Sequence, residues 1–151
     1  MQFGDYRIEI IPDTEFRLDG GAMFGVVPRN LWSRVAPPDD QNRIRMNMNC
    51  LFIETDSEKI LIETGIGEKW SAKHASIYGI TRKQSLTESL RSIAGVEPDQ
   101  ITIVINTHLH FDHAGGNTSS CSDGTVRPTF PNARYLVSRA EWEHAEQPSE
   151  R

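Results

Sequence analysis

The sequence predicts a mixed α/β fold built in layers, and three observations support this prediction. Two apolar runs at residues 46–54 and 59–63 are joined by a short turn-forming segment, which indicates a β-hairpin. Residues 85–95 place their apolar side chains at helical spacing. The β-branched run at residues 101–105 has the composition of a strand buried on both faces. Strands and helices that follow one another in this way are typical of a layered α/β domain.

The N-terminal region begins with a predicted strand. Residues 6–11 alternate in polarity, and Pro12 is expected to end the strand. From residue 19 to residue 42 the composition changes to that of a loop, rich in glycine and proline but also in apolar side chains. A long loop of this kind usually covers a pocket or packs on a core, and its Phe24 and Trp32 fit either place.

Two helices can be given boundaries from their capping residues. Ser85 and Glu88 have the spacing of a capping box, and Gly95 follows the last apolar residue as a C-cap. Residues 134–137 indicate a further strand, and residues 138–141 repeat the serine and glutamate spacing of a capping box. We therefore expect a second helix directly after that strand.

Length and composition restrict the class of protein. The 151 residues fit one domain, and the content of 37% hydrophobic and 25% charged residues is ordinary for a globular chain. The net charge of -5 and the scattered basic residues argue against a nucleic-acid-binding surface. The sequence has no signal-peptide pattern and no run of ~20 apolar residues to cross a bilayer, so we expect no membrane partner and a cytoplasmic location.

One short segment carries an unusual density of metal-binding residues. Three histidines and an aspartate, His108, His110, Asp112 and His113, fall within six positions directly after a predicted strand. Residues two apart in an extended segment point the same way, so His108 and His110 can present their imidazoles to one metal ion. Asp112 and His113 follow after the chain has begun to bend and can reach a second, adjacent ion. Imidazole and carboxylate ligands suit zinc, and iron, manganese and cobalt bind the same groups.

The residues around this segment have simpler interpretations. Gly115 and Gly116 allow the backbone to turn tightly and to pass close to the metal ions. His74 and His144 lie in polar stretches and are expected on the surface. The chain's two cysteines are far apart and outside any Cys-x-x-Cys pair, so both are expected to be free thiols. Cys121, the nearer one, is interpreted as a loop cysteine without a role at the metal site.

Residues 107–117 read Thr-His-Leu-His-Phe-Asp-His-Ala-Gly-Gly-Asn, which resembles the HxHxDH motif of the metallo-β-lactamase superfamily. Residues 60–65 resemble the strand that ends in Asp-Thr-Gly beneath the metal site of this family, and residues 130–137 resemble the strand after the motif. The resemblance spans most of residues 46–145. The Phe-Asp-His-Ala-Gly-Gly pattern and the long N-terminal loop are most similar to the lactonase and organophosphate-hydrolase-like branches.

The resemblance implies a four-layer αββα sandwich built from two similar halves, with the metals at one edge between the sheets. Residues 1–151 are then expected to be the N-terminal half of one such domain. The chain is expected to be truncated before a third histidine, a bridging aspartate and a final histidine, which complete the metal shell in this family. The C-terminal half of the same fold, or a second copy of the chain, is the expected protein partner.

Carried onto this sequence, the resemblance implies a hydrolase with two zinc ions. His108 and His110 are expected to bind the first ion, and Asp112 and His113 the second, with a metal-bound hydroxide as nucleophile. Asp112 is also the expected catalytic proton donor to the leaving group. Glu63 replaces the aspartate that is common in the family. It is interpreted with equal weight as a hydrogen-bond acceptor that supports a metal ligand or as a solvated surface carboxylate.

The expected substrate is a small ester-like molecule or a lactone, as for the quorum-quenching lactonases. Thioester hydrolysis of the glyoxalase II kind and phosphotriester hydrolysis are the alternatives among enzymes. A non-catalytic metal-binding fragment and a diiron redox protein are the alternatives from other classes, although the sequence shows no flavin-binding segment. Metal analysis, together with turnover on lactones, thioesters and phosphotriesters, distinguishes these functions.

Overall fold

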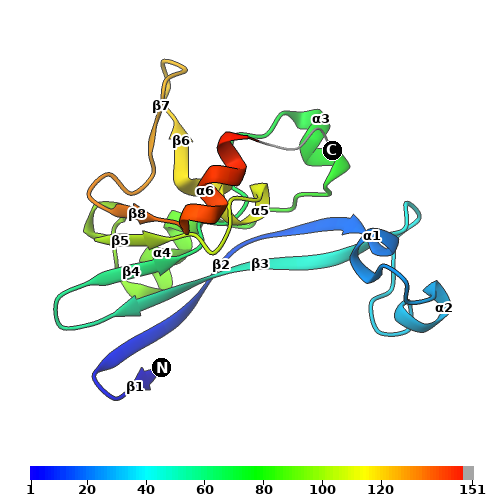
Figure 1. Ribbon diagram of the computed structural model, residues 1–151, viewed down its shortest axis with the longest axis horizontal. Helices are drawn as coiled ribbons and strands as arrows, with labels where there is room; N and C mark the ends of the chain where they lie inside the picture. Colours follow the sequence, from blue (N-terminus) through cyan, green and yellow to red (C-terminus); the bar gives the residue numbers. More distant parts are fainter. Residues whose placement is uncertain (148–151) are drawn as a thin grey trace.

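The computed structural model describes residues 1–147, and its main feature is a six-stranded sheet (Figure 1). The strands lie in the order β1-β2-β3-β4-β5-β8, while β6 and β7 form a separate hairpin that projects from the body of the molecule. Strands β1 to β4 pair antiparallel, whereas β4, β5 and β8 are parallel. The strands are β1 Gln2–Phe3, β2 Tyr6–Asp19, β3 Arg43–Glu54, β4 Lys59–Ile62, β5 Ile103–Ile105, β6 Thr118–Ser120, β7 Val126–Pro128 and β8 Arg134–Leu136.

Short helices connect these strands. In the part of the chain that the structure describes, none of them is long and apolar enough to cross a membrane. The α-helices are α1 Gly20–Phe24, α2 Arg29–Trp32, α3 Ala72–Ile77, α4 Leu86–Ala94, α5 Phe111–Ala114 and α6 Arg139–Glu146. Two 3-10 helices, η1 Pro98–Gln100 and η2 Gly115–Asn117, complete the set.

The predicted hairpin and the first predicted helix are confirmed. β3 and β4 pair antiparallel across the short turn between them. At the start of α4, the Ser85 hydroxyl accepts from the Glu88 N–H while the Glu88 carboxylate accepts from the Ser85 N–H. The helix ends at Gly95, whose φ of 69° lies in the left-handed region that favours glycine. The strand and helix expected after residue 133 are also present, as β8 and α6.

The boundary predicted at Pro12 is wrong. The register of β2 against β3 shifts between Pro12 and Thr14, and β2 then continues to Asp19. A β-bulge accommodates proline because the missing N–H is not needed for the ladder at that position. β2 and β3 together therefore form a long ribbon that extends well beyond the rest of the sheet (Figure 1).

The predicted loop at residues 19–42 contains α1 and α2, which lie at the far end of this ribbon (Figure 1). Trp32 is buried there and stacks on Phe24 with ring centroids 5.1 Å apart. A Cβ added to Gly20 would overlap the Trp32 ring, so only glycine fits beneath it. Of the two places open to these aromatic side chains, the structure therefore shows mutual packing at the ribbon tip.

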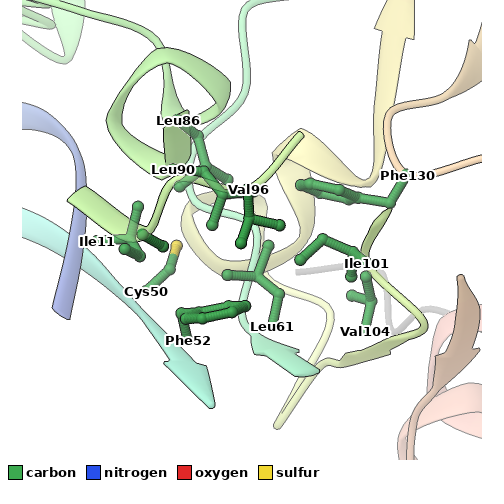
Figure 2. Close-up of a cluster of buried hydrophobic side chains, with 11 residues drawn as sticks. Ile11, Cys50, Phe52, Leu61, Leu86, Leu90, Val96, Ile101, Val104 and Phe130 are labelled. Carbon is green, nitrogen blue, oxygen red and sulfur yellow. The ribbon is translucent and has the colours of Figure 1, made fainter. Parts of the chain in front are cut away.

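The main core lies between α4 and one face of the sheet (Figure 2). Leu86 and Leu90 project from α4 toward buried side chains of the strands. The apolar stripe of α4 therefore packs on the sheet, as the helical spacing of its apolar residues predicted. The core consists of Ile11, Cys50, Phe52, Leu61, Leu86, Leu90, Ala94, Val96, Ile101, Val104 and Phe130.

The opposite face of the sheet is also apolar, and we call it the isoleucine face. Residues 103–105 form β5, with Val104 fully buried on the core side and Ile103 and Ile105 partly exposed on the other, so one of the two faces expected to be buried is uncovered in the described chain. Cross-strand pairing aligns Ile10, Leu51, Ile62, Ile105 and Leu136 in one row of this face, and Ile8, Ile53, Ile60 and Ile103 in a second row. At the two ends of the first row, Ile10 and Leu136 are 63% and 43% exposed.

Candidate metal centre

The histidine motif leaves the carboxyl end of β5, the strand that lies between β4 and β8. Residues 106–110 are irregular and lead into the single turn of α5, so the side chains of the motif are directed by a sharp change of backbone direction. The ring centroids of His108 and His113 are 3.9 Å apart, and those of His108 and His110 are 4.8 Å apart. The fold therefore brings the three imidazoles together, with the His113 ring closer than the His110 ring to His108.

Two carboxylates lie on either side of the His113 ring. Asp112 Oδ2 is 3.6 Å from His113 Nε2, and Glu63 Oε2 is 3.4 Å from His113 Nδ1. Glu63 is 6% exposed, and its other oxygen accepts a hydrogen bond from the Thr107 N–H at 2.8 Å. Glu63 is therefore not a solvated surface carboxylate. Its φ of 66° turns the chain sharply after β4 and directs the side chain at the motif.

The residues present fit a divalent metal ion. Glu63, His108 and His113 each offer one ligand atom, and these atoms all lie within 4.8 Å of one another. Among residues 1–147, Glu63 Oε2 and His113 Nδ1 are buried but have no hydrogen-bond partner, which is costly for a buried polar atom. Imidazole nitrogens with carboxylate oxygens form the donor set that zinc prefers. A cation bound in this cluster would provide the buried Glu63 oxygen and His113 nitrogen with the polar partner that they lack.

A second loop holds the motif in place by direct backbone contact. The Thr64 N–H donates to the His113 carbonyl at 2.8 Å, and the Gly116 N–H donates to the Gly65 carbonyl at 3.2 Å. A Cβ on Gly115 or Gly116 would overlap backbone atoms of residues 64–66. The two glycines after the motif thus permit a close backbone approach, whereas the expected approach to metal ions stays a prediction. The approach is to the loop after β4.

A buried ion pair fixes that loop from its other side. Asp13 accepts from the Ile66 N–H at 2.8 Å and pairs with Arg82, which also donates to the Gly67 carbonyl at 2.7 Å. Burial raises the pKa of the Asp13 carboxyl, against the opposing effect of the Arg82 charge. No signal in the sequence identified Asp13, because the residue was assigned to the turn after a short strand.

Gly65 allows a direct test of this interlock. Its φ is 71°, and a Cβ there would overlap the Asp13 carboxylate, whereas Gly95 has a φ of 69° with nothing within 4 Å of a Cβ. We expect Gly65→Ala to lower the free energy of unfolding by about 1–3 kcal/mol more than Gly95→Ala, because it adds overpacking to the same backbone strain. Denaturant unfolding of both variants measures the difference, and equal losses would contradict the interlock.

Comparison with known proteins identifies the family. Residues 44–135 match the model of the metallo-beta-lactamase superfamily, and the matched segment contains the hairpin, α4, β5 and the whole histidine motif. The chain belongs to the metallo-beta-lactamase superfamily. The mixed α/β architecture and the resemblance drawn from the motif are thereby confirmed.

The superfamily members that are similar in sequence include lactonases. The N-acyl homoserine lactonase AiiA of Bacillus thuringiensis subsp. kurstaki is 31% identical over 106 residues, covering 64% of this chain and 38% of that protein. The N-acyl homoserine lactonase of Bacillus cereus is 29% identical over 117 residues, covering 70% of this chain and 42% of that protein. This chain thus spans less than half of the length of these relatives.

Solved structures of the superfamily superimpose on almost the whole chain. A probable metal-dependent hydrolase from Staphylococcus aureus is 32% identical with a TM-score of 0.89, covering 99% of this chain and 52% of that one. An N-acyl homoserine lactone hydrolase with N-hexanoyl-L-homoserine at its catalytic metal centre is 26% identical with a TM-score of 0.64, covering 95% and 52%. The superfamily fold is therefore matched over about half of each solved chain.

Three aromatic side chains beside the motif were not anticipated from the sequence. Phe111 lies 5.0 Å from Tyr78 and 5.7 Å from Trp70 between ring centroids, and Trp70 and Tyr78 are 5.3 Å apart. Phe111 belongs to the motif itself, whereas Trp70 and Tyr78 come from the segment that contains α3. Together they form an apolar wall that includes one residue of the motif, Phe111. The weak helical signal of residues 72–77 gave no reason to place this segment there.

The remaining candidate residues lie away from the imidazole cluster. His74 and His144 are exposed on α3 and α6, as expected. Both cysteines are free thiols. Cys50 belongs to the core, where burial raises the pKa of its thiol well above the ordinary value, and Cys121 lies in the turn between β6 and β7.

Proposed function

We propose that this chain supplies the histidine-motif half of a zinc-dependent lactonase of the quorum-quenching kind. The observation that carries the proposal is the cluster of His108, His110, Asp112 and His113 at the end of β5, with Glu63 buried behind it. The sequence relatives named N-acyl homoserine lactonases support a lactone as the substrate. The N-acyl homoserine lactone hydrolase of the same fold carries its product at a catalytic metal centre, which supports a metal-dependent reaction.

The proposed ligands divide between two metal ions. His108 and His110 hold the first ion, and Asp112 and His113 hold the second, while the Glu63 carboxylate, with Oε2 3.4 Å from His113 Nδ1, orients that ring through its charge. Zinc, when bound, supplies Lewis acidity and an activated water. Iron, manganese and cobalt are the other ions that this donor set suits.

Hydrolysis of a lactone adds a water oxygen to the acyl carbon, breaks the bond between that carbon and the ring oxygen, and leaves an alkoxide that needs a proton. Asp112, partly buried and beside His113, is the proposed donor of that proton. The apolar wall of Trp70, Tyr78 and Phe111 offers a surface for an acyl substituent of the substrate. The chain's own residues thus account for proton delivery and for one side of the substrate site.

Four ligands are too few for two catalytic ions. They leave each ion with two protein ligands, whereas catalytic zinc usually has three. We propose that the further ligands come from a second half of the same αββα domain, or from a second copy of the chain, seated on the isoleucine face. The relatives whose lengths exceed the matched segment about twofold support this arrangement. Residues 1–151 are then the N-terminal portion of one domain.

Replacing Asp112 by asparagine tests the catalytic assignment. In the assembled protein, we expect the turnover number on an N-acyl homoserine lactone to fall at least about 100-fold, with a smaller change in KM, because the carboxylate acts in the transition state. Asp56→Asn is the control, since Asp56 is exposed in the turn between β3 and β4. A turnover number that is unchanged in Asp112→Asn would remove Asp112 from the mechanism.

A further inference from the structure

The backbone that carries the first two histidines has an unexpected anchor on α6. The N–H of Leu109, the residue between His108 and His110, donates to Oε1 of Glu141 at 2.9 Å, across 32 positions of sequence. The spacing of Ser138 and Glu141 predicts a reciprocal capping box, but only one half forms. The Ser138 hydroxyl accepts from the Glu141 N–H, and the Glu141 carboxylate accepts from Leu109. In the described chain, the Glu141 carboxylate thus accepts a hydrogen bond from the motif and not from the N-terminus of its own helix.

The burial of α6 agrees with this use of Glu141. Glu141 is the only residue of α6 that is partly buried, and every other residue from Arg139 to Glu146 is exposed. Figure 1 shows α6 following β8 and lying beside the motif region. The helix therefore contributes no buried apolar stripe. Among residues 1–147, this is the one hydrogen bond that connects α6 to the histidine segment.

The motif segment also depends on side-chain acceptors, because its last backbone bond to a strand is that of the Asn106 N–H with the Leu136 carbonyl of β8. Residues 106–110 lie outside any strand. The Thr107 N–H donates to Glu63 and the Leu109 N–H donates to Glu141, so two carboxylates from distant elements hold alternate peptide groups. Hydrogen bonds with a charged acceptor are short and about twice as strong as neutral ones.

We propose that Glu141 is a positioning residue for the metal site. By fixing the peptide group at Leu109 it sets the direction in which the flanking His108 and His110 imidazoles leave the backbone. Ligand rings must be held within narrow limits for metal binding, and partners of this kind typically change metal affinity about 10–100-fold. The inference rests on the proposed function as far as the metal is concerned, but the anchored backbone can be measured without it.

Four variants separate positioning from helix capping. Glu141→Ala removes the acceptor, Glu141→Gln keeps an oxygen that can accept from Leu109, Ser138→Ala removes the cap alone, and Glu143→Ala changes an exposed carboxylate of the same helix. Amide hydrogen exchange at Leu109 is measured in the metal-free assembled protein. Zinc affinity is measured by competition with a chromophoric chelator.

We expect Glu141→Ala to speed exchange at Leu109 at least about tenfold and to weaken zinc binding about 10–100-fold. Glu141→Gln restores most of both, and Ser138→Ala and Glu143→Ala change zinc affinity less than about twofold. Unchanged exchange in Glu141→Ala overturns the anchor, and unchanged zinc affinity overturns its role in positioning. A wild-type protein that binds no zinc refutes the proposed function and the positioning role with it, while the exchange data still decide whether the anchor exists.

Discussion

Replacing His113 by alanine is expected to reduce zinc affinity by more than about 100-fold, the largest effect of any single substitution in this chain. Loss of a residue that only supports a ligand costs about 10–100-fold, and loss of a ligand costs more. The His113 ring also lies between Asp112 and Glu63, so its removal leaves two carboxylates close together without the group that separates them. Zinc content after dialysis, determined by elemental analysis, measures the effect.

His108→Ala and His110→Ala are expected to lower zinc content as well, because each removes a proposed ligand of the first ion. His144→Ala is the matched control, since His144 is exposed on α6 and is not assigned to the metal. Full zinc occupancy in all three motif variants would refute the ligand assignment.

The second large effect is expected at the isoleucine face. Alone, the 17.1 kDa chain should self-associate or unfold readily and show negligible hydrolase activity, because two rows of partly exposed isoleucine and leucine side chains need cover. Ile62→Asp places a carboxylate at the centre of the first row. Burying an unpaired polar group costs about 2–7 kcal/mol, so we expect association through this face to weaken at least about 30-fold.

Val26→Asp provides the control for the face. Val26 is 100% exposed at the tip of the ribbon, so a carboxylate there adds the same charge without touching the isoleucine face. Sedimentation of the two variants and the parent chain measures the association. A stable monomer of the parent chain with lactonase activity would contradict the proposal that a second half covers this face.

The sequence predicted the parts of this protein that depend on local chemistry. α4 formed between Ser85 and Gly95 because a capping box and a left-handed glycine act over a few residues. The density of histidines within six positions is also a local signal, and the structure gathers the three rings of the motif at the end of β5. Metal binding there stays a prediction.

Features that depend on distant partners were not predictable. From the sequence, Pro12 is expected to end a strand; the strand continues because the pairing with β3 contains a bulge at this position. Glu63 is directed at His113 by a left-handed backbone conformation, which the sequence does not indicate for a glutamate. Glu141 has the sequence spacing of a capping box, yet its carboxylate accepts a hydrogen bond from the Leu109 N–H, 32 positions away in sequence, and not from the backbone of its own helix. The protein segment that covers the isoleucine face likewise cannot be predicted from local sequence patterns.

The most direct test of the metal-dependent lactonase is one preparation assayed in three states. Zinc content and turnover of an N-acyl homoserine lactone are measured in the assembled protein as isolated, after removal of metal by a chelator, and after zinc is returned. We expect turnover to be lost with the metal, to recover in proportion to the zinc bound, and not to recover in His113→Ala. Lactone turnover that persists without metal, or a zinc-loaded protein that hydrolyses no lactone, would contradict the account.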